Sequence, residues 1–424
     1  MLNIMVEKLE DFDVVIVGGG PSGANTAISY KKLSPNLKIA VFDKASFPRD
    51  KSCGDAIGPG VINALKRFGN EDILENEPQV VSTTLFGPDD VGIQNYIPQV
   101  KNKEDSVVYV IPRLELDNRI LNKAKNLDVK VFGIFSFFNF DLDKDIVLAT
   151  FKSGEKLYHV KTKLLIGADG ANSRVRSNLK IKSNSDKHKA IAIRAYIDSP
   201  NYLDVFKERT LMFEINVSAE KGYAWAFPSR DKMLNIGIGV PLNIFKKDSL
   251  NLDELLKNFI DQLNSRGVVT ENIRLKKSYL LPFASFRPKI PNPNRVALVG
   301  DASSMINPMS GEGIFYGMEA GYLLAKNTIN LINSEKINQG IKNYYKEFNK
   351  RFNKHYLSCT LARLVLQVPF MTKRLLKVAS KDQNTIDFVV ELLFDEAHLT
   401  LSEVLKLTLK FLLPQKLLLN TLKN

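Results

Sequence analysis

Cysteine, histidine and long uncharged apolar runs are scarce in this 424-residue chain, and each scarcity excludes a class of protein. Two cysteines cannot build a disulfide scaffold, and so few suit a reducing compartment. No stretch offers the roughly 18 uncharged apolar residues of a membrane-spanning helix. The first residues, MLNIMVEKLEDFD, lack the positive start, apolar core and cleavage site of a secretory signal. No two histidines have metal-ligand spacing; they are His159, His188, His355 and His398. We therefore expect a cytoplasmic chain without a bound metal.

The net charge is strongly positive, at +13, with 44% apolar and 25% charged residues. These fractions are typical of a globular protein, and the length predicts about two or three domains. Nucleic acid is not expected as a partner, because no basic run is interleaved with aromatic residues. Two interpretations of the charge stay open: an ordinary solvated surface, or contact with an anionic membrane surface.

The stretch DVVIVGGGPSGANTAISYKKL carries the first chemical motif. Its apolar run Val14–Val17 predicts a buried parallel strand, and the glycines after it match G-x-G-x-x-G. The first glycine allows a tight turn, the second lets a pyrophosphate approach the backbone, and the third lets the helix pack on the strand. The helix N-terminus then faces the phosphates. The residues predicted at this site are Gly18, Gly20, Pro21, Ser22 and Gly23.

A second predicted strand, KIAVFD, ends in Asp43, twenty residues after Gly23. A carboxylate at this distance is expected to meet a ribose hydroxyl of a dinucleotide. We include the adjacent Lys44 in the predicted site. The alternative is a glycine turn in an unrelated βαβ unit.

Two later stretches again place an acidic residue after an apolar strand. KLLIGADGANSRVRSNL carries Asp169, and NRVALVGDASSMINPMSGEGIFYGMEAG carries Gly300 and Asp301 before a glycine-rich loop. With the first motif, they resemble flavoproteins of the p-hydroxybenzoate hydroxylase type. The resemblance implies FAD as the cofactor, with Asp301 at its ribityl chain and Arg113, in VIPRLELDNRI, near its diphosphate and ribityl chain. It also implies a loop and helix start near the isoalloxazine ring, formed by Pro308, Gly311, Glu312, Gly313 and Ile314.

The chain has no second dinucleotide fingerprint, since GIGVPL at 237–242 begins like one but ends in leucine. A separate nicotinamide domain is therefore not expected. Electrons would come from transiently bound NAD(P)H or from a ferredoxin-like protein.

Three signatures are similar to those of the geranylgeranyl reductase family. YAWAFPSRDKMLNIGIG resembles its Y-x-W-x-F-P…G-x-G pattern, FPRDKSCGDAIGPG its P-C-G-D signature, and NPMSGEGI its N-P-x-x-G-E-G-I. The chain departs from the pattern at Ser52, where many members have proline. The resemblance covers about residues 10–330. It implies reduction of C=C bonds in a polyprenyl group by hydride from reduced flavin.

The resemblance also assigns roles to two short segments. Cys53, Gly54 and Asp55 would be catalytic, with the first two also contacting the flavin, although Cys53 as a small packed hydrophobe is the alternative. Alternating residues of a strand share one face. An apolar tunnel for an isoprenoid chain would therefore be lined by Tyr223, Trp225 and Phe227, with Pro228 after them. Plain core packing is the alternative for Trp225.

The C-terminal stretch is rich in leucine and carries no motif that we can match. Lys406 and Lys410 lie off a leucine stripe, and Pro414 argues against a membrane span. Packing on the protein itself and lying on a lipid surface both stay open. The stripe consists of Leu401, Leu405, Leu409 and Leu412.

These observations predict an α/β fold with a Rossmann-type FAD-binding domain, an interleaved mixed β-sheet substrate domain and a C-terminal helical region. The expected limits are 1–77, 113–188 and 285–330 for the first, 78–112 and 189–284 for the second, and 331–424 for the third. The predicted function is FAD-dependent reduction of a polyprenyl group on a lipid, quinone or related isoprenoid, with peripheral contact to the inner face of a membrane. A monooxygenase or halogenase of the same fold, and a flavin-binding module without turnover, are the alternatives.

Overall fold

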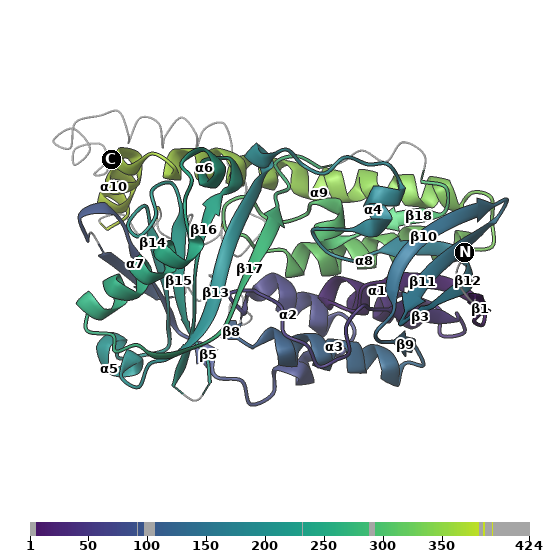
Figure 1. Ribbon diagram of the computed structural model, residues 1–424, viewed down its shortest axis with the longest axis horizontal. Helices are drawn as coiled ribbons and strands as arrows, with labels where there is room; N and C mark the ends of the chain where they lie inside the picture. The colour runs from purple at the N-terminus through teal and green to yellow at the C-terminus, as the bar shows by residue number, and fades with distance from the viewer. Residues whose placement is uncertain are drawn as a thin grey trace, which may run out of the picture.

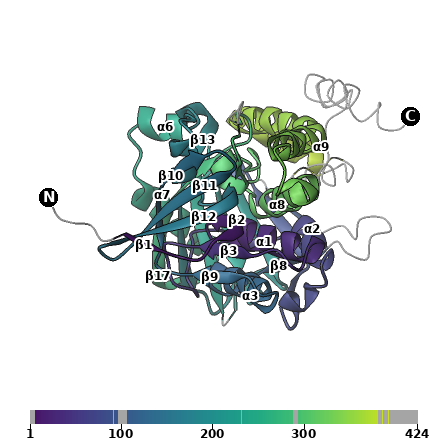
Figure 2. The ribbon, with the colours of Figure 1, turned by 90° about the vertical axis from the view of Figure 1, so that its right-hand side faces the viewer.

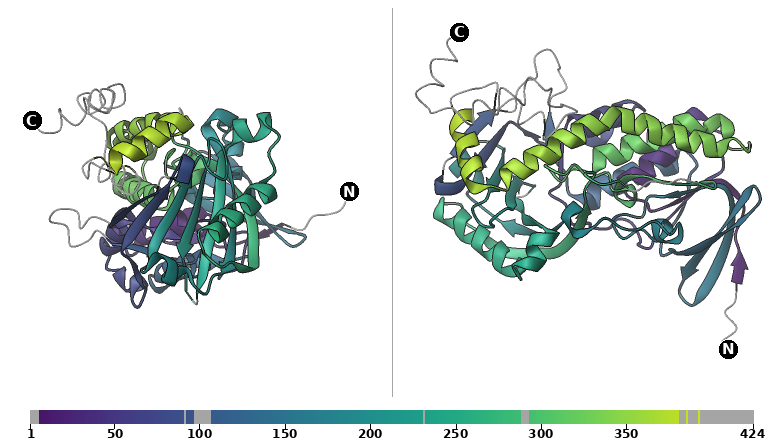
Figure 3. Two further views of the ribbon diagram at one scale, coloured as in Figure 1. Left: turned by 90° about the vertical axis from the view of Figure 1, so that its left-hand side faces the viewer. Right: turned by 90° about the horizontal axis from the view of Figure 1, so that it is seen from above.

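The computed structural model of the chain describes residues 6–90, 92–96, 107–230, 232–287, 293–380, 385 and 392. Two sheets lie toward opposite ends of an elongated molecule (Figure 1). The long helix α9 (Ile337–Leu366) runs along the molecule beside both of them (Figure 3). The predicted fold class is confirmed by this architecture, while the exact domain limits stay a prediction.

Five parallel strands form the centre of the first sheet, in the order β9-β3-β2-β12-β18. Their bounds are Phe12–Val17 (β2), Ile39–Phe42 (β3), Lys130–Phe132 (β9), Lys156–Gly167 (β12) and Val296–Leu298 (β18). Both faces of this sheet are covered, which explains why its strands are apolar runs rather than alternating patterns. The carboxyl ends of β2, β3 and β18 therefore deliver the glycine and aspartate motifs to one edge.

Helices cover one face of the parallel sheet and a β-meander covers the other (Figure 2). The meander consists of β10 (Ser136–Asp143), β11 (Ile146–Ser153) and the first half of β12, which also pairs with β1 (Val6–Lys8). The short helix α4 (Arg174–Asn178) lies against β10 and β12. The helical layer contains α1 (Pro21–Leu33), α2 (Pro59–Lys66), α3 (Arg113–Asn126), α8 (Ile314–Thr328) and part of α9.

Helices α1 and α8 approach unusually closely because glycines face small side chains. A β-carbon on Gly317 would lie 2.0 Å from Ser22 Oγ, and one on Gly321 would lie 2.1 Å from Thr26 Oγ1. This contact places the start of α1, which follows the glycine turn, beside the start of α8. Two motifs almost 300 residues apart are thus held together by backbone packing.

The second sheet has seven strands in the order β17-β13-β16-β15-β14-β6-β7. Only the β14–β6 pair is parallel in this described sheet. The bounds are Ser82–Phe86 (β6), Gly92–Tyr96 (β7), Lys189–Asp198 (β13), Thr210–Ile215 (β14), Tyr223–Pro228 (β15), Met233–Pro241 (β16) and Glu271–Pro282 (β17).

The two faces of β15 meet different partners. Ala224 and Ala226 pack in a cluster with α7 (Leu252–Ser265), near which α5 (Tyr202–Phe206) and α6 (Leu242–Lys247) also lie. On the opposite face, Trp225 and Phe227 pack with a small sheet of β4 (Ala56–Ile57), β8 (Val108–Val110) and β5 (Gln79–Val80). This inner face is directed toward the segments that carry the predicted cofactor site.

Helix α9 ends at the second sheet and is followed by α10 (Pro369–Ala379). At about 1.5 Å per residue, its 30 residues span about 45 Å. Within the described ranges, none of the helices combines the length and the apolar character needed to cross a membrane. The leucine stripe predicted at 401–412 lies outside the described residues.

Candidate functional site

The turn after β2 has the geometry of a phosphate-binding turn. Gly18 has φ +107°, and a β-carbon there would lie 2.4 Å from the Ala168 carbonyl oxygen. A β-carbon on Gly23 would lie 1.9 Å from the Gly18 oxygen. Helix α1 begins at Pro21 without a side-chain cap or an acidic residue in its first turn. Its first N–H groups and positive dipole end are therefore suited to an anion.

Asp43 is fixed at the end of β3 by backbone donors. The Gly19 N–H donates to its Oδ2 atom at 2.7 Å, and the Ala45 N–H donates to Oδ1 at 2.8 Å. Each carboxylate oxygen can accept a second hydrogen bond. The geometry suits a ribose hydroxyl, whereas Lys44 is exposed beside it.

Two arginines share one buried carboxylate beside the glycine turn. Asp117 accepts from Arg49 Nη1 at 2.9 Å and from Arg113 Nε and Nη2 at 2.5 and 2.8 Å. Burial opposes the charge of Arg113, but Asp117 raises the pKa of its guanidinium well above the usual value. The Nη2 atom of Arg49 would lie 3.3 Å from a β-carbon on Gly20. Arg49 is thus placed over the turn where a diphosphate is expected.

Asp301, three residues after the end of β18, is the centre of a second charged group. Lys51 Nζ lies 3.2 Å from Asp301 Oδ2, and the Tyr279 hydroxyl donates to the same oxygen at 2.9 Å. Burial raises the pKa of Asp301, but the Lys51 ammonium, the Tyr279 hydroxyl and Arg113 together outweigh it and hold the pKa below its usual range. The carboxylate is therefore ionised and oriented. Next to it, Gly300 has φ +62° and packs against Ser22.

Asp169 has a different environment from the other predicted acids. Ser173 Oγ donates to its Oδ1 atom at 2.5 Å, and the Arg174 and Val175 N–H groups donate to Oδ2 at 2.7 and 3.2 Å. These contacts orient the start of α4. The structure thus shows a capping role for Asp169, and its contact with the cofactor stays a prediction.

The loop before α8 is shaped by Asn307. Its Oδ1 atom accepts from the N–H groups of Met309 and Ser310 at 2.8 and 3.2 Å, and its Nδ2 atom lies 3.2 Å from His355 Nε2. Gly311 follows with φ +76°. Gly313 precedes α8, whose N-terminus has no side-chain cap. A second positive helix end therefore follows Pro308–Gly313, with Glu312 and Ile314 partly exposed beside it.

The Cys53–Asp55 loop lies between the arginine group and the second sheet. Cys53 interacts with Arg113, and burial together with the Cys53 thiol raises the pKa of Tyr223. A β-carbon on Gly54 would lie 2.9 Å from the Phe227 ring and 3.4 Å from Trp225 Nε1. Phe227 and Trp225, both predicted as substrate-binding residues, therefore pack directly against the predicted catalytic loop at Gly54.

Asp55 is the most perturbed acid of this loop. It is fully buried with φ +66°, and its Oδ2 atom accepts from the Tyr196 hydroxyl and from Asn235 Nδ2, the latter at 2.7 Å. Its Oδ1 atom has no hydrogen-bond partner among the described residues. Burial outweighs these donors and raises the pKa of Asp55 to about 6. Asn235 also accepts from Trp225 Nε1 at 2.9 Å, which couples the acid to the aromatic face.

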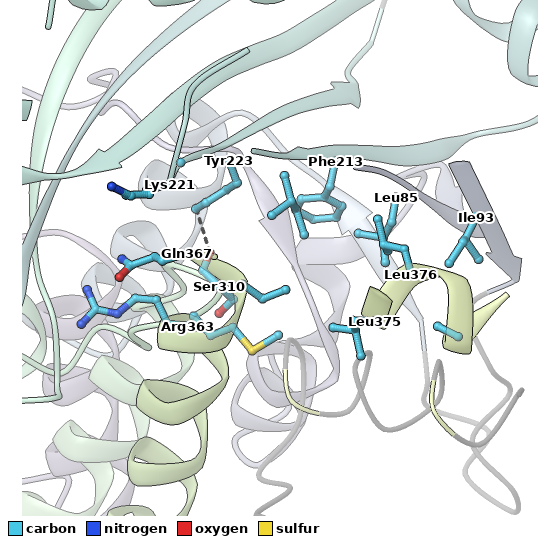
Figure 4. Close-up of a pocket in the computed structure, with 15 residues that line it drawn as sticks. Leu85, Ile93, Phe213, Lys221, Tyr223, Ser310, Arg363, Gln367, Leu375 and Leu376 are labelled. Carbon is cyan, nitrogen blue, oxygen red and sulfur yellow. Dashed lines mark hydrogen bonds between the residues drawn. The ribbon is translucent and has the colours of Figure 1, made fainter. Parts of the chain in front are cut away.

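An apolar cavity opens beside the loop at Pro308–Gly311 (Figure 4). Its empty space amounts to roughly 890 Å³ when the open solvent at its mouth is included. Tyr223 lines it and donates to the Ser310 carbonyl oxygen at 3.0 Å. Trp225, Phe227 and Pro228 are buried beneath and are not part of its wall. Its apolar wall includes Leu85, Ile93, Phe213, Ile215, Leu375 and Leu376.

Sequence reasoning missed four residues that contact the predicted site. Arg49 and Lys51 belong to the stretch FPRDKSCGD, where a pair of cations beside glycines was a usable signal. Asp117 lies one helical turn after Arg113, a spacing that also suggested a pair. Tyr279 had no such signal, because its place at Asp301 depends on the course of β17.

The residues present fit FAD. An uncapped helix start and Arg49 suit a diphosphate, and a carboxylate fixed at a strand end suits the ribose of a dinucleotide. The fold and the site together define an FAD-binding protein of the Rossmann type.

Comparison with known proteins gives the family. The chain matches the FAD binding domain family over residues 11–355. It is 30% identical over 325 residues to a menaquinone reductase of Mycolicibacterium smegmatis, covering 74% of this chain and 75% of the relative. The protein belongs to this family and is an FAD-dependent oxidoreductase.

A further relative confirms the resemblance to geranylgeranyl reductases, and two solved structures share the fold. A digeranylgeranylglycerophospholipid reductase of Thermoplasma acidophilum is 25% identical over 414 residues, covering 93% of this chain and 94% of the relative. A geranylgeranyl bacteriochlorophyll reductase-like structure from the same organism has a TM-score of 0.77 at 21% identity, with 96% and 97% of the chains covered. A flavin-dependent brominase has a TM-score of 0.71 at 18% identity, with 91% and 95% covered, and shows the shared fold alone.

Proposed function

We propose that the protein saturates C=C bonds in a polyprenyl group carried by a lipid, quinone or related isoprenoid. The observation that carries the proposal is the apolar cavity, which ends at the loop before α8. Burying an apolar chain there contributes about 0.8 kcal/mol per methylene. The names of the relatives, menaquinone reductase and digeranylgeranylglycerophospholipid reductase, support the same class of substrate.

Saturation of a double bond adds a hydride to one carbon and a proton to the other. FAD, when bound and reduced, supplies the hydride. The Cys53–Asp55 loop offers two ionisable groups, a thiol and a carboxyl, that can hold the proton. With a pKa of about 6, about a tenth of the Asp55 carboxyls carry a proton at pH 7. Trp225 and Phe227 exclude water from the underside of this loop.

Contact with a membrane surface is part of the proposal, because the substrate has to leave a bilayer. An apolar stripe is exposed near the cavity, with Phe370 at 67% exposure on α10. Leu366 and Gln367, which belong to the cavity wall, lie between members of this stripe in the chain. The other members are Leu357, Leu361, Leu364 and Val368. The spacing of three and four residues places Leu357, Leu361 and Leu364 on one side of α9, and Val368 follows the end of this helix.

The electron donor is proposed as NAD(P)H bound transiently or as a ferredoxin-like protein. Each donor can be offered to the oxidised holoenzyme under argon while the flavin absorbance is followed. The donor that reduces the flavin within the turnover time is the physiological class. Dithionite provides the reference for complete reduction.

The decisive experiment is anaerobic turnover. Dithionite-reduced holoenzyme is mixed with a digeranylgeranyl phospholipid or with menaquinone, and the products are analysed by mass spectrometry. We expect flavin reoxidation and products heavier by two hydrogen atoms for each reduced bond. Phe213→Gln in the cavity wall should slow turnover, whereas the control Phe138→Gln, exposed on the meander, should not. Reoxidation only by oxygen, with an oxygenated or halogenated product, would instead establish the monooxygenase or halogenase alternative.

A further inference from the structure

The apolar cavity has one strongly polar end. In Figure 4, Arg363, Gln367 and Lys221 lie together at this end, whereas Leu376 and Ile93 lie at the other. A second, smaller cavity reaches the same place from the side of β13 and β16. We call the residues that line both cavities the neck: Lys221, Gly222, Tyr223, Met309, Arg363 and Gln367.

Arg363 in the neck carries a charge that the described part of the chain does not balance. No described carboxylate lies within 4.0 Å of its guanidinium, and its Nε atom is buried without a hydrogen-bond partner there. Its guanidinium contacts the Phe283 ring, at 4.9 Å from Cζ to the centroid, and burial together with the nearby Arg363 lowers the pKa of His188. Burial alone lowers the pKa of the guanidinium, with no acid to oppose it. The Arg363 side chain is partly exposed, but its buried Nε atom lacks a hydrogen-bond partner among the described residues, and a ligand could supply one.

Helix capping does not explain this arginine. It lies in the last turn of α9, where a cation favours the helix dipole. The Leu366 carbonyl at this helix end, however, already accepts from Asn216 Nδ2 at 2.6 Å and Thr372 Oγ1 at 3.0 Å. Arg363 makes no recorded bond to a helix carbonyl, and its guanidinium lines the cavities instead.

Lys221 adds a second cation to the neck. It sits in the turn between β14 and β15, and its recorded ion pair is a loose one at 3.7 Å with the neighbouring Glu220, which is 73% exposed. The Gln367 amide can donate two further hydrogen bonds. The neck therefore combines a planar fork of donors, a flexible ammonium and an amide around one space. This set suits a tetrahedral anion with several oxygens.

We propose that the neck binds the phosphate or diphosphate group of the polyprenyl substrate while its apolar chain extends into the apolar cavity. This assignment rests on the proposed function and narrows it to an anionic, phosphorylated isoprenoid. A neutral head group would leave Arg363 without a counter-ion. The same phosphate chemistry is present in a soluble prenyl diphosphate and in a glycerophospholipid.

Binding to the oxidised holoenzyme tests the assignment without any turnover. Titration calorimetry in one detergent would compare geranylgeranyl diphosphate with geranylgeraniol, which has the same chain without the anion. A digeranylgeranyl glycerophosphate would form the third arm. Arg363→Gln removes the charge, Arg363→Lys retains it, and Lys354→Gln removes an exposed charge from the same helix as a control. Lys221→Gln offers a second neck variant at a surface turn.

We expect both phosphorylated ligands to bind wild type at least tenfold more tightly than the alcohol. Arg363→Gln should weaken them about 10- to 100-fold, and Lys221→Gln about 3- to 10-fold, because charge-assisted hydrogen bonds are lost. The alcohol should be unaffected, Arg363→Lys should retain part of the affinity, and Lys354→Gln all of it. The tighter of the two phosphorylated ligands identifies the source of the phosphate.

Equal binding of alcohol and diphosphate by wild type would overturn the assignment, whether or not Arg363→Gln folds. Equal weakening of alcohol and diphosphate by Arg363→Gln would also overturn it, since that indicates lost packing. Tight, Arg363-dependent phosphate binding without reduction of any isoprenoid would uphold the neck and refute the proposed reductase. The two failures are therefore distinguishable.

Discussion

Replacing Asp55 by asparagine should stabilise the protein at neutral pH, and the gain should vanish in acid. Asparagine keeps the shape, tolerates the left-handed backbone at φ +66°, and its side-chain oxygen can still accept from Tyr196 and Asn235. What it removes is the charge of a buried carboxylate whose Oδ1 atom has no partner among the described residues.

Asparagine is expected to stabilise the protein at neutral pH because burial raises the pKa of Asp55 to about 6 from an ordinary 3.8. Between about pH 4 and 6 the folded chain holds this proton more firmly than the unfolded chain does. The stability contributed by Asp55 is thus full below pH 4, falls as pH rises, and is lost above pH 6. At 1.36 kcal/mol per pKa unit, the loss amounts to about 3 kcal/mol.

Urea unfolding of the FAD-saturated protein at several pH values would measure this difference. We expect the free energy of unfolding of Asp55→Asn minus wild type to rise from near zero at pH 4 to about 3 kcal/mol at pH 7. Asp128→Asn is the matched control, because Asp128 also has a positive φ but is 81% exposed. A difference that stays flat across this range would refute the reasoning.

Three further variants test other contacts. Gly321→Ala should lower the free energy of unfolding in urea by about 1–3 kcal/mol, because the new β-carbon would meet Thr26. The double variant with Thr26→Ala should recover part of this loss. An unchanged urea midpoint for Gly321→Ala would contradict the close packing. Asp117→Asn should lower the stability of the FAD-free protein by about 3–5 kcal/mol because Arg113 loses its counter-ion. Added FAD should then raise Tm more in this variant than in wild type, because its diphosphate would replace the lost carboxylate as the partner of Arg113. An equal rise in Tm would argue against a contact between Arg113 and the diphosphate. Cys53→Ala should leave FAD bound, seen in the visible spectrum, but change turnover or the product pattern; identical turnover and products would leave packing as its role.

The glycines of the first turn could be predicted because their roles are local. Gly18 adopts φ +107° in its own turn, and a β-carbon on Gly23 would lie 1.9 Å from the Gly18 oxygen, five residues earlier in the chain. The pairing of Lys51 with Asp301 could not be predicted, because 250 residues separate the two. The role of Arg363 could not be predicted either, because it depends on the lack of a described carboxylate near its guanidinium in the folded chain.

Residue type alone was ambiguous at other positions. Asp169 and Asp301 both follow apolar strands, yet the first orients a helix start and the second is held by Lys51 and Tyr279. The period of two correctly predicted that Trp225 and Phe227 share one face. It could not predict that Gly54 would cover that face and leave Tyr223 to line the cavity.

The packing of α8 on α1 has a consequence for synthesis on the ribosome. Helix α1 begins at Pro21, but the helix that covers it begins at Ile314. At about 5–20 residues per second, roughly 15–60 seconds separate the emergence of the two. During that time the glycine turn lacks Asp301 and the face around Thr26 lacks its cover. The nascent chain therefore depends on late-made residues for a complete cofactor site, and a fragment that ends before α8 should neither hold FAD nor stay soluble without a chaperone.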